Sequence, residues 1–167
     1  MIRKATINDI PSIMDTIRLT VEEMKSYNNT QWDENYPLSK DFKEDIQNGD
    51  LYVHDVDGEV YGFICVNYIE PKEYDNLNWS SNEKAMVVHR VAVNPTFRNK
   101  GIGSKLLKFA DDLAKENNVA YLKTDTYSIN VKMNSLFKKC GYKHIGEMDF
   151  LGKEKPFYCY DKKLSDE

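Results

Sequence analysis

Cysteine is scarce in this chain, and its few copies form no recognisable motif. The 167 residues include three cysteines, Cys65, Cys140 and Cys159, whose spacing matches neither a metal-binding nor a redox motif. Cys65 and Cys159 fall inside strand-like runs, which is typical of buried free thiols in a reduced compartment. The sequence therefore argues against a disulfide-stapled secreted domain, and it predicts no metal site.

Long apolar runs and an excess of basic residues are also missing. No hydrophobic stretch approaches the length that a membrane-spanning helix needs, and no signal peptide opens the sequence. The net charge of −4 argues against general binding to nucleic acid. We therefore expect a cytoplasmic protein that has neither a membrane nor a nucleic acid as its partner.

Internal repeats, low-complexity tracts and linkers are absent as well. A chain of 167 residues is long enough to bury a real core and falls within the usual range of one domain. We therefore predict that residues 1–167 form a single domain.

Hydrophobic periodicity predicts an α/β fold with a mixed sheet. Residues 10–24 and 102–114 carry apolar side chains at helical spacing, whereas residues 87–93 and 119–126 are rich in β-branched and apolar residues. Asp57-Gly58 separates two further strand-like runs and predicts a two-residue hairpin. The complete expected order is β-α-α-β-β-β-α-β-α-β-β, with helices on both faces of the sheet. Strand 119–126 follows a helical crossover, so we expect it to run parallel to strand 87–93.

What the sequence does contain is a basic, glycine-punctuated turn between a strand and a helix. Strand 87–93 is closed by Pro95, and Arg98–Gly103 leads directly into the next helix. Such a turn directs backbone N–H groups, a helix N-terminus and two cations to one place, which suits a phosphate or pyrophosphate. Gly101 and Gly103 would let the ligand approach the backbone closely. The alternative is a plain turn into a helix with no ligand.

Two other phosphate-binding motifs fit this turn less well. A dinucleotide-binding fingerprint requires a third glycine where this chain has Leu106. A P-loop requires Lys-Ser or Lys-Thr directly after its closing glycine, where this chain has Ile102.

With these motifs in place, the chain resembles the GNAT family of N-acetyltransferases over essentially all its residues. The resemblance rests on the strand end Val91–Pro95, on Arg98–Gly103 as the family's R/Q-x-x-G-x-G/A turn, and on Asn130 followed by Gly141-Tyr142. It implies a GNAT-like acyltransferase fold. It also implies a transferase that uses acetyl-CoA as its co-substrate and needs no metal.

The resemblance further implies how acetyl-CoA would be held. The pyrophosphate would lie on the glycine turn, and the pantetheine arm would add like a strand to the sheet edge at Val91 and Val93. A backbone N–H near Val91 would polarise the thioester carbonyl as an oxyanion donor. Asn130 matches the family's Asn that contacts the cofactor arm. The implied cofactor-binding residues are Val91, Val93, Arg98, Asn99, Lys100, Gly101, Ile102, Gly103, Ser104 and Asn130.

The transfer reaction needs a neutral amine, and His89 is the candidate base. An ordinary amine has a pKa near 10.4, so removing its proton at neutral pH costs about 4 kcal/mol. His89 lies on the strand expected to line the thioester, and histidine can titrate near neutral pH. Strict alternation places it on the face of Val91 and Val93, although a bulge would change that parity. The alternative is a structural histidine that orients Arg90.

Position 137 departs from the family pattern. The family often places a Tyr seven residues after the Asn that starts this helix, as the acid that protonates the leaving thiolate; this chain has Phe137. Because a thiol has a pKa of roughly 8.5, an acid contributes only about 2 kcal/mol here. Tyr127, Tyr142 and solvent are the substitutes that the sequence offers.

A segment rich in aromatic and acidic residues is the candidate acceptor site. Trp32, Glu34 and Tyr36 lie where the family joins its first two helices and walls the acceptor pocket. Aromatic rings beside carboxylates suit a cationic amine. The alternative is an aromatic plug over the core with a solvated acidic rim.

Taken together, these features predict an N-acetyltransferase that moves an acetyl group from acetyl-CoA to a primary amine by direct attack on the thioester. The acceptor is a small-molecule amine or a peptide N-terminus. The alternative from another class is a non-catalytic acetyl-CoA sensor of the same fold, which Phe137 keeps open. A homodimer also stays open, because the closing strands of such folds can pair across a dimer.

Overall fold

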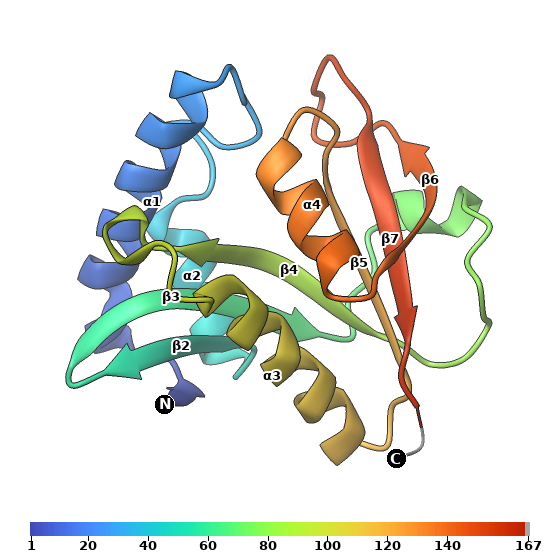
Figure 1. Cartoon of the computed structure of the whole chain (residues 1–167), viewed down its shortest axis with the longest axis horizontal. Coiled ribbons are helices and arrows are strands. Elements are labelled where there is room, and N and C mark those ends of the chain that lie inside the picture. The colour runs from blue at the N-terminus through green and yellow to red at the C-terminus, as the bar shows by residue number, and fades with distance from the viewer. Residues whose placement is uncertain (166–167) are drawn as a thin grey trace. The chain divides into compact units, whose positions relative to one another are not determined.

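The helices and strands follow the order that the periodicity predicts. The computed structural model describes residues 1–165. The elements are β1 (Ile2–Lys4), α1 (Ile10–Ser26), α2 (Ser39–Gln47), β2 (Leu51–Val56), β3 (Glu59–Asn67), β4 (Met86–Val93), α3 (Ile102–Glu116), β5 (Tyr121–Tyr127), α4 (Val131–Lys139), β6 (Lys143–Met148) and β7 (Phe157–Lys163). The strands form a mixed sheet in the order β1-β2-β3-β4-β5-β7-β6, and Figure 1 shows these elements along the chain. The predicted α/β fold class is thereby confirmed.

The chain divides into two units, and each unit is built from two separate stretches of the sequence. The first unit comprises Met1–Val66 and Arg90–Leu106, and the second comprises Asn67–His89 and the chain from Leu107 onward. The boundaries therefore fall at the end of β3, inside β4 between His89 and Arg90, and inside α3 between Leu106 and Leu107. A single domain over residues 1–167 stays a prediction.

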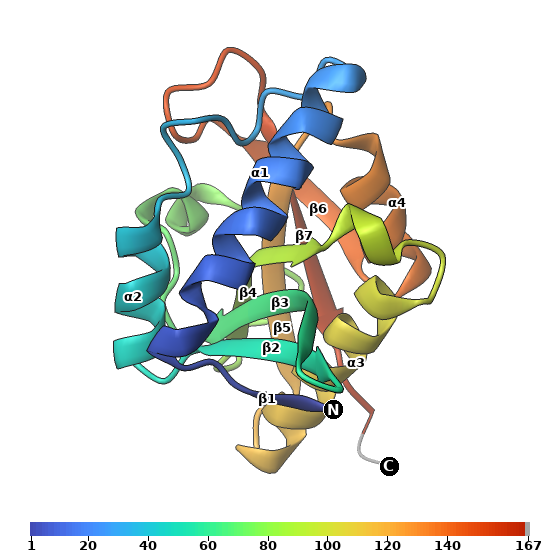
Figure 2. The same ribbon diagram turned by 90° about the vertical axis from the view of Figure 1, so that its left-hand side faces the viewer.

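In the first unit, helices α1 and α2 cover one face of an antiparallel ladder. Strand β1 pairs with β2 and β2 pairs with β3, and Asp57-Gly58 turns between them with φ angles of 52° and 88°. Positive φ at both central residues is what a tight hairpin turn requires, so the predicted hairpin is confirmed. Figure 2 shows α1 and α2 against these strands. The buried side chains between them include Ile13, Ile17, Trp32, Phe42, Leu51, Val53, Phe63 and Cys65.

The opposite face of β3 receives the first turn of α3, and Gly62 permits this close packing. A Cβ atom added at Gly62 would lie 2.7 Å from the carbonyl oxygen of Ala92. It would also lie 3.2 Å from the Leu106 side chain and 3.3 Å from that of Ile102. A carbon cannot approach a backbone oxygen that closely, so this position requires glycine if β3, β4 and the start of α3 are to keep their spacing.

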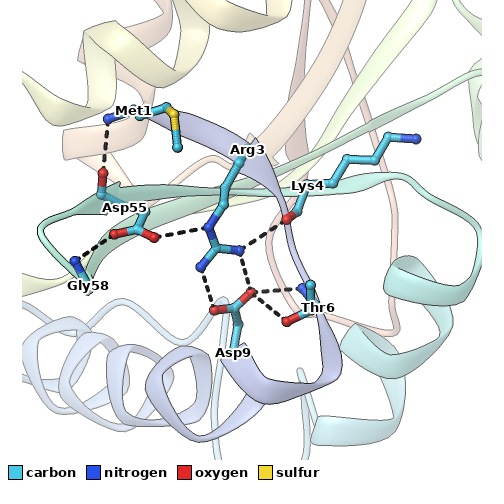
Figure 3. A network of polar contacts seen from close by, with 7 residues as sticks. All are labelled: Met1, Arg3, Lys4, Thr6, Asp9, Asp55 and Gly58. Atoms are coloured by element: carbon cyan, nitrogen blue, oxygen red, sulfur yellow. Dashed lines mark hydrogen bonds and ion pairs between the residues drawn. The ribbon is translucent and has the colours of Figure 1, made fainter.

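Arg3 ties the N-terminal strand to its neighbours (Figure 3). Its guanidinium donates two hydrogen bonds of 2.9 Å to the carboxylate of Asp9 and one of 3.0 Å to Asp55. Asp9 also accepts a 2.7 Å bond from the Thr6 backbone N–H, and Asp55 accepts one of 2.9 Å from Gly58. The network therefore links β1, the start of α1 and the β2–β3 hairpin through one cation.

In the second unit, β7 lies between β5 and β6. Residues Met86–Val88 of β4 pair in parallel with Leu122–Thr124 of β5, which confirms the parallel crossover that the sequence predicts. Strand β7 is antiparallel to both β5 and β6. One face of these strands carries a buried cluster, which consists of Tyr74, Val87, Tyr127, Met148, Phe157 and Cys159.

The cysteines are free thiols, and Cys65 and Cys159 are fully buried as predicted. Burial raises the pKa of both thiols well above the usual range. Among residues 1–165, no helix is both long and apolar enough to span a bilayer. Over the same residues, no group of three His, Cys, Asp or Glu side chains is arranged to hold a metal ion.

Candidate active site

The glycine turn exposes the start of α3. Asn99 and Gly101 adopt positive φ angles of 64° and 70°, and α3 begins at Ile102. The N–H of Lys105 donates to the carbonyl of Gly101 at 3.1 Å, which is the first turn of the helix ladder. The N–H groups of Ile102 and Gly103 precede that bond, and a helix offers no intrahelical acceptor to such groups. The turn therefore presents backbone donors at the positive end of a helix dipole.

Two contacts hold this turn in place. Arg98 forms an ion pair with Glu23 of α1. The ring of Phe97 stacks on Tyr61 of β3 with centroids 3.9 Å apart and planes 10° apart. The sequence suggested two cations for a phosphate at this turn; the structure shows that Arg98 is already paired, while Lys100 is exposed. The electrostatic support for an anion therefore comes mainly from backbone groups.

Strand β4 offers its backbone rather than its side chains at Val91 and Val93. Val91 is buried, whereas Val93 is half-buried. Ala92 packs into the cluster beneath α1 and α2, and Arg90 bonds to α2, so Val91 and Val93 point to the other face. Any contact with a cofactor arm along this edge would be made by main-chain groups.

Arg90 connects β4 to both α2 and the segment after α1. Its guanidinium donates to both carboxylate oxygens of Asp45, with distances of 2.6 to 3.0 Å, and its Nη1 donates to the Tyr36 hydroxyl at 2.8 Å. Burial is the main cause of the raised pKa of Tyr36, so its phenol stays protonated and keeps a hydrogen to donate. Planar bidentate bonding of this kind fixes the orientation of the Arg90 guanidinium and also pairs its charge with Asp45.

The structure separates the three residues of the candidate acceptor segment. Trp32 is only 7 % exposed and packs in the α1/α2 cluster, which favours the packing interpretation for this ring. Glu34 is exposed, and Tyr36 is half-buried. Glu34 and Tyr36 are therefore the members of this segment that a ligand could reach.

His89 makes one hydrogen bond whose direction can be assigned. Its Nε2 lies 2.6 Å from Oδ1 of Asn67, and the same Oδ1 accepts a 2.9 Å bond from the Ile69 backbone N–H. Because the Ile69 N–H can only donate, this atom of Asn67 is the amide oxygen. His89 must therefore donate through Nε2, and in the neutral imidazole the lone pair is on Nδ1.

The alternation expected along β4 breaks at His89. The strand is buried on both sides of the half-buried pair His89-Arg90, so burial does not follow a period of two there. Arg90 takes its partners from Asp45 and Tyr36. Both observations weaken the simple placement of His89 on the face of Val91 that the sequence suggested.

Asn130 is the N-cap of α4, at the helix start that the sequence predicts, and its side chain is hydrogen-bonded to the backbone of that helix. Its Oδ1 accepts a 3.1 Å hydrogen bond from the N–H of Met133, which is a helix N-cap, and the residue is buried. Asn134, one turn later, donates to the carbonyls of Tyr127, Ser128 and Asn130. The turn before α4 is therefore held by two side-chain amides.

Phe137 is enclosed by aromatic rings. It is 1 % exposed, and its ring centroid lies 5.4 Å from that of Tyr142 and 5.5 Å from that of Tyr160. Of the substitutes considered for the missing acid, Tyr127 is buried and accepts a bond from the Lys155 N–H. The hydroxyl of Tyr142 is buried without a partner among residues 1–165. Neither phenol is placed in contact with solvent.

An open polar pocket of about 370 Å³ is lined by residues of the loop that precedes β4. Lys123 of β5 borders it and is itself 7 % exposed. Its ammonium donates to Glu70 at 2.8 Å and lies 4.5 Å from the ring centroid of Trp79. Lys123 is the one cationic residue among those that the structure describes in β5, and it is already paired with Glu70.

Sequence reasoning missed the residues that fix the site indirectly. Asn67 sets the tautomer of His89, Asp45 fixes Arg90, and Gly62 admits the start of α3. None lies near its partner in the sequence, so no local motif marks it. Of these residues, only Gly62 carried a sequence signal, because a glycine inside a strand-like run can indicate that another backbone segment approaches closely.

Comparison with known proteins gives one consistent result. A model of the acetyltransferase (GNAT) family matches residues 17–142. YesJ, an uncharacterized N-acetyltransferase of Bacillus subtilis, is 24% identical over 149 residues, which cover 85% of this chain and 81% of YesJ. Streptothricin acetyltransferase of Escherichia coli is 29% identical over 121 residues, which cover 72% of this chain and 64% of that protein.

Solved structures give the same answer for the fold. A GNAT-family acetyltransferase of Streptococcus agalactiae superposes with a TM-score of 0.87 at 27% identity, covering 99% of this chain and 96% of that one. A Salmonella typhimurium structure with its cofactor acetyl-CoA has a TM-score of 0.68 at 16% identity, covering 100% of this chain and 95% of that one. The second likeness concerns the fold alone.

Proposed function

The chain belongs to the GNAT family of acetyltransferases, and we propose that it moves the acetyl group of acetyl-CoA to a small primary amine by direct attack on the thioester. It is an acetyl-CoA-dependent N-acetyltransferase; the acceptor, the direct attack and the residue roles are the proposal. Family membership favours this enzyme over the non-catalytic sensor that the sequence left open.

The observation that carries the cofactor assignment is the start of α3. The N–H groups of Ile102 and Gly103 stand at the N-terminus of a helix without an intrahelical acceptor, which suits an anionic diphosphate. Lys100 is exposed beside them. We assign the pyrophosphate to the backbone of Arg98–Ser104 and the pantetheine amides to the edge at Val91 and Val93.

The chemistry requires a neutral amine and a polarised carbonyl. Bound acetyl-CoA supplies the acetyl group as a thioester. The backbone N–H near Val91 would donate to the carbonyl oxygen as negative charge develops there. His89 Nδ1 would take the amine proton, directly or through water, while Asn67 holds the opposite ring nitrogen as a donor. The new C–N bond replaces the C–S bond, and the thiolate leaves.

A small cationic amine is the acceptor class that the chain supports best. The streptothricin acetyltransferase relative points to a small-molecule acceptor rather than a peptide N-terminus. Within the first unit, the exposed carboxylate of Glu34 and the phenol of Tyr36 lie close in sequence and are open to a ligand. Carboxylates and aromatic faces both attract ammonium groups.

An amine panel tests this function. Purified protein is mixed with acetyl-CoA and small primary amines, peptides with free N-termini, and tertiary amines as controls. We expect thiol release that depends on the primary amine, together with the acetylated amine by mass spectrometry. Tight acetyl-CoA binding without transfer to any amine would contradict the proposal and revive the sensor.

Substitution of Gly103 tests the cofactor assignment separately. Gly103 lies in the first turn of α3, so a side chain there would stand where the diphosphate approaches the backbone. We expect Gly103→Val to abolish acetyl-CoA binding by calorimetry with near-native circular dichroism, and Gly103→Ala to weaken it less. Unchanged affinity in Gly103→Val would refute the pyrophosphate position.

A further inference from the structure

An ion pair joins the glycine turn to the first helix of the chain. Arg98, the first residue of the turn, pairs through Nη2 with Oε2 of Glu23, and the two side chains are 38% and 22% exposed. Glu23 lies near the end of α1, far from the turn in sequence but in the same unit of the structure. The pair therefore ties the start of the turn to an element that only the tertiary fold brings to it.

The turn itself has little packing to hold it. The stacked ring of Phe97 precedes it, and the buried side chain of Ile102 follows it. Residues 98–101 between them are exposed, and a Cβ atom added at Gly101 would meet nothing within 4 Å. Glycine adds backbone freedom to such a segment. Within residues 1–165, the ion pair with α1 is the one polar side-chain contact that this exposed stretch makes to another element.

The charge of Glu23 is unfavourable for an anion at this turn. A carboxylate beside Arg98 cancels the charge of the guanidinium and repels a diphosphate. If the ion pair had no other effect, Glu23 would weaken the binding of acetyl-CoA. Any benefit from Glu23 must therefore come from the position of the turn. A segment that is already ordered loses less conformational entropy when its ligand binds.

We propose that Glu23 and Arg98 are positioning residues for acetyl-CoA. Their ion pair holds the first residue of the turn against α1, so the backbone that leads into α3 is ordered before the diphosphate arrives. The inference rests on the proposed position of the pyrophosphate, and it adds a determinant of cofactor affinity that lies on α1. Neither side chain takes part in the transfer of the acetyl group.

The test measures the Kd of acetyl-CoA by calorimetry for Glu23→Gln, Arg98→Gln and the double variant. We expect Glu23→Gln to raise Kd by about two- to fivefold, because a partly exposed ion pair makes a modest contribution. Arg98→Gln should raise Kd at least as much, since it also removes a cation from the turn. In the Arg98→Gln background the pair is already lost, so adding Glu23→Gln should leave Kd unchanged or lower it.

Glu22→Gln is the matched control. Glu22 is the neighbouring residue on α1, and its ion-pair partner is Arg18 of the same helix, at 3.6 Å. This variant changes the net charge equally but keeps the contact to the turn, so its Kd should match the wild type. In Glu23→Gln, kcat at saturating acetyl-CoA and the KM of the amine should stay within about twofold of wild type. A merely destabilised fold would instead lower the melting temperature and the active fraction without raising Kd.

The outcomes separate this inference from the cofactor assignment. Unchanged or tighter binding in Glu23→Gln would overturn the positioning role. An equal loss in Glu22→Gln, or a loss that persists in the Arg98→Gln background, would also overturn it. If Gly103→Val abolishes binding in the same assay, the pyrophosphate position stands in each of these cases. Unchanged affinity in Gly103→Val would refute that position, and the inference with it.

Discussion

At the scale of single residues, Phe137 has no hydroxyl and therefore cannot act as the acid that protonates the leaving thiolate. Protonating the thiolate is worth about 2 kcal/mol, whereas deprotonating the amine is worth about 4 kcal/mol. An enzyme with Phe137 should therefore work more slowly than one with an acid, but it should work.

We expect Phe137→Tyr to raise kcat by no more than about tenfold, which corresponds to 1.4 kcal/mol. The ring at 137 is 1 % exposed between Tyr142 and Tyr160, so the new hydroxyl enters a buried aromatic site. If it finds no partner there, it should lower stability by about 1 to 3 kcal/mol. Steady-state rates and thermal melts measure both effects, and a gain of more than a hundredfold would show that the missing acid limits the natural enzyme.

The assigned tautomer of His89 gives a second residue-scale prediction. Asn67→Asp keeps an oxygen that accepts from both His89 Nε2 and the Ile69 N–H, but adds a negative charge 2.6 Å from the imidazole. That charge favours imidazolium. We therefore expect the acid limb of the kcat/KM profile to move to higher pH.

Asn67→Leu is the matched control, because it removes the acceptor without adding charge. Asn67→Leu should lower kcat without moving the acid limb of the kcat/KM profile to higher pH. A profile that is identical for Asn67→Asp and wild type would show that His89 is not the group that titrates in this reaction.

At the scale of elements, the sequence predicted what local chemistry determines. The Asp57-Gly58 hairpin, the strand before Pro95 and the helix starting at Asn130 all follow from turn and capping residues. The parallel pairing of β4 and β5 followed from the crossover rule. These features need only a few neighbouring residues to specify them.

Contacts between distant residues could not be predicted in this way. Arg98 of the turn pairs with Glu23 of α1, and Trp32 is buried in the cluster beneath α1 and α2. Asn67 contacts His89 although 22 residues separate them in the sequence. Sequence spacing holds no information on such contacts until the register is known.

Gly62 gives the element-scale prediction. A Cβ at this position would press on the Ala92 carbonyl at 2.7 Å and on Ile102 and Leu106, the first residues of α3 that face the sheet. Gly62→Ala should therefore displace the start of α3. We expect a lower melting temperature and weaker acetyl-CoA binding, by about tenfold or more if the turn moves.

Gly146→Ala is the control for that substitution. Its added Cβ would meet only the end of the Leu77 side chain, at 3.3 Å, which can move aside. Acetyl-CoA affinity should be unchanged in this variant. Equal effects of the two substitutions would mean that the spacing at Gly62 does not position the turn.

At the scale of the whole molecule, two carboxylates act on stability in opposite directions with pH. Asp9 is bound by Arg3, which holds its pKa below the usual range. Its contribution to stability is present above the unfolded pKa near 4 and is lost as the pH falls through the folded value. Burial raises the pKa of Asp125 to about 6, so its folded form is favoured when protonated. That contribution is lost as the pH rises through about 6.

We therefore expect the melting temperature to be highest near pH 4, to fall between about pH 4 and 6, to level off at higher pH and to fall again below pH 4. Arg3→Gln should flatten the acid side, because Asp9 and Asp55 lose the guanidinium that favours their ionised forms. Asp125→Asn should raise the melting temperature at pH 8 and leave it nearly unchanged at pH 4. Differential scanning calorimetry across this range tests both limbs independently. If Asp125→Asn melts lower than wild type at pH 8, the ionised carboxylate has a stabilising partner in the folded protein, and the fall in melting temperature between pH 4 and 6 has another cause.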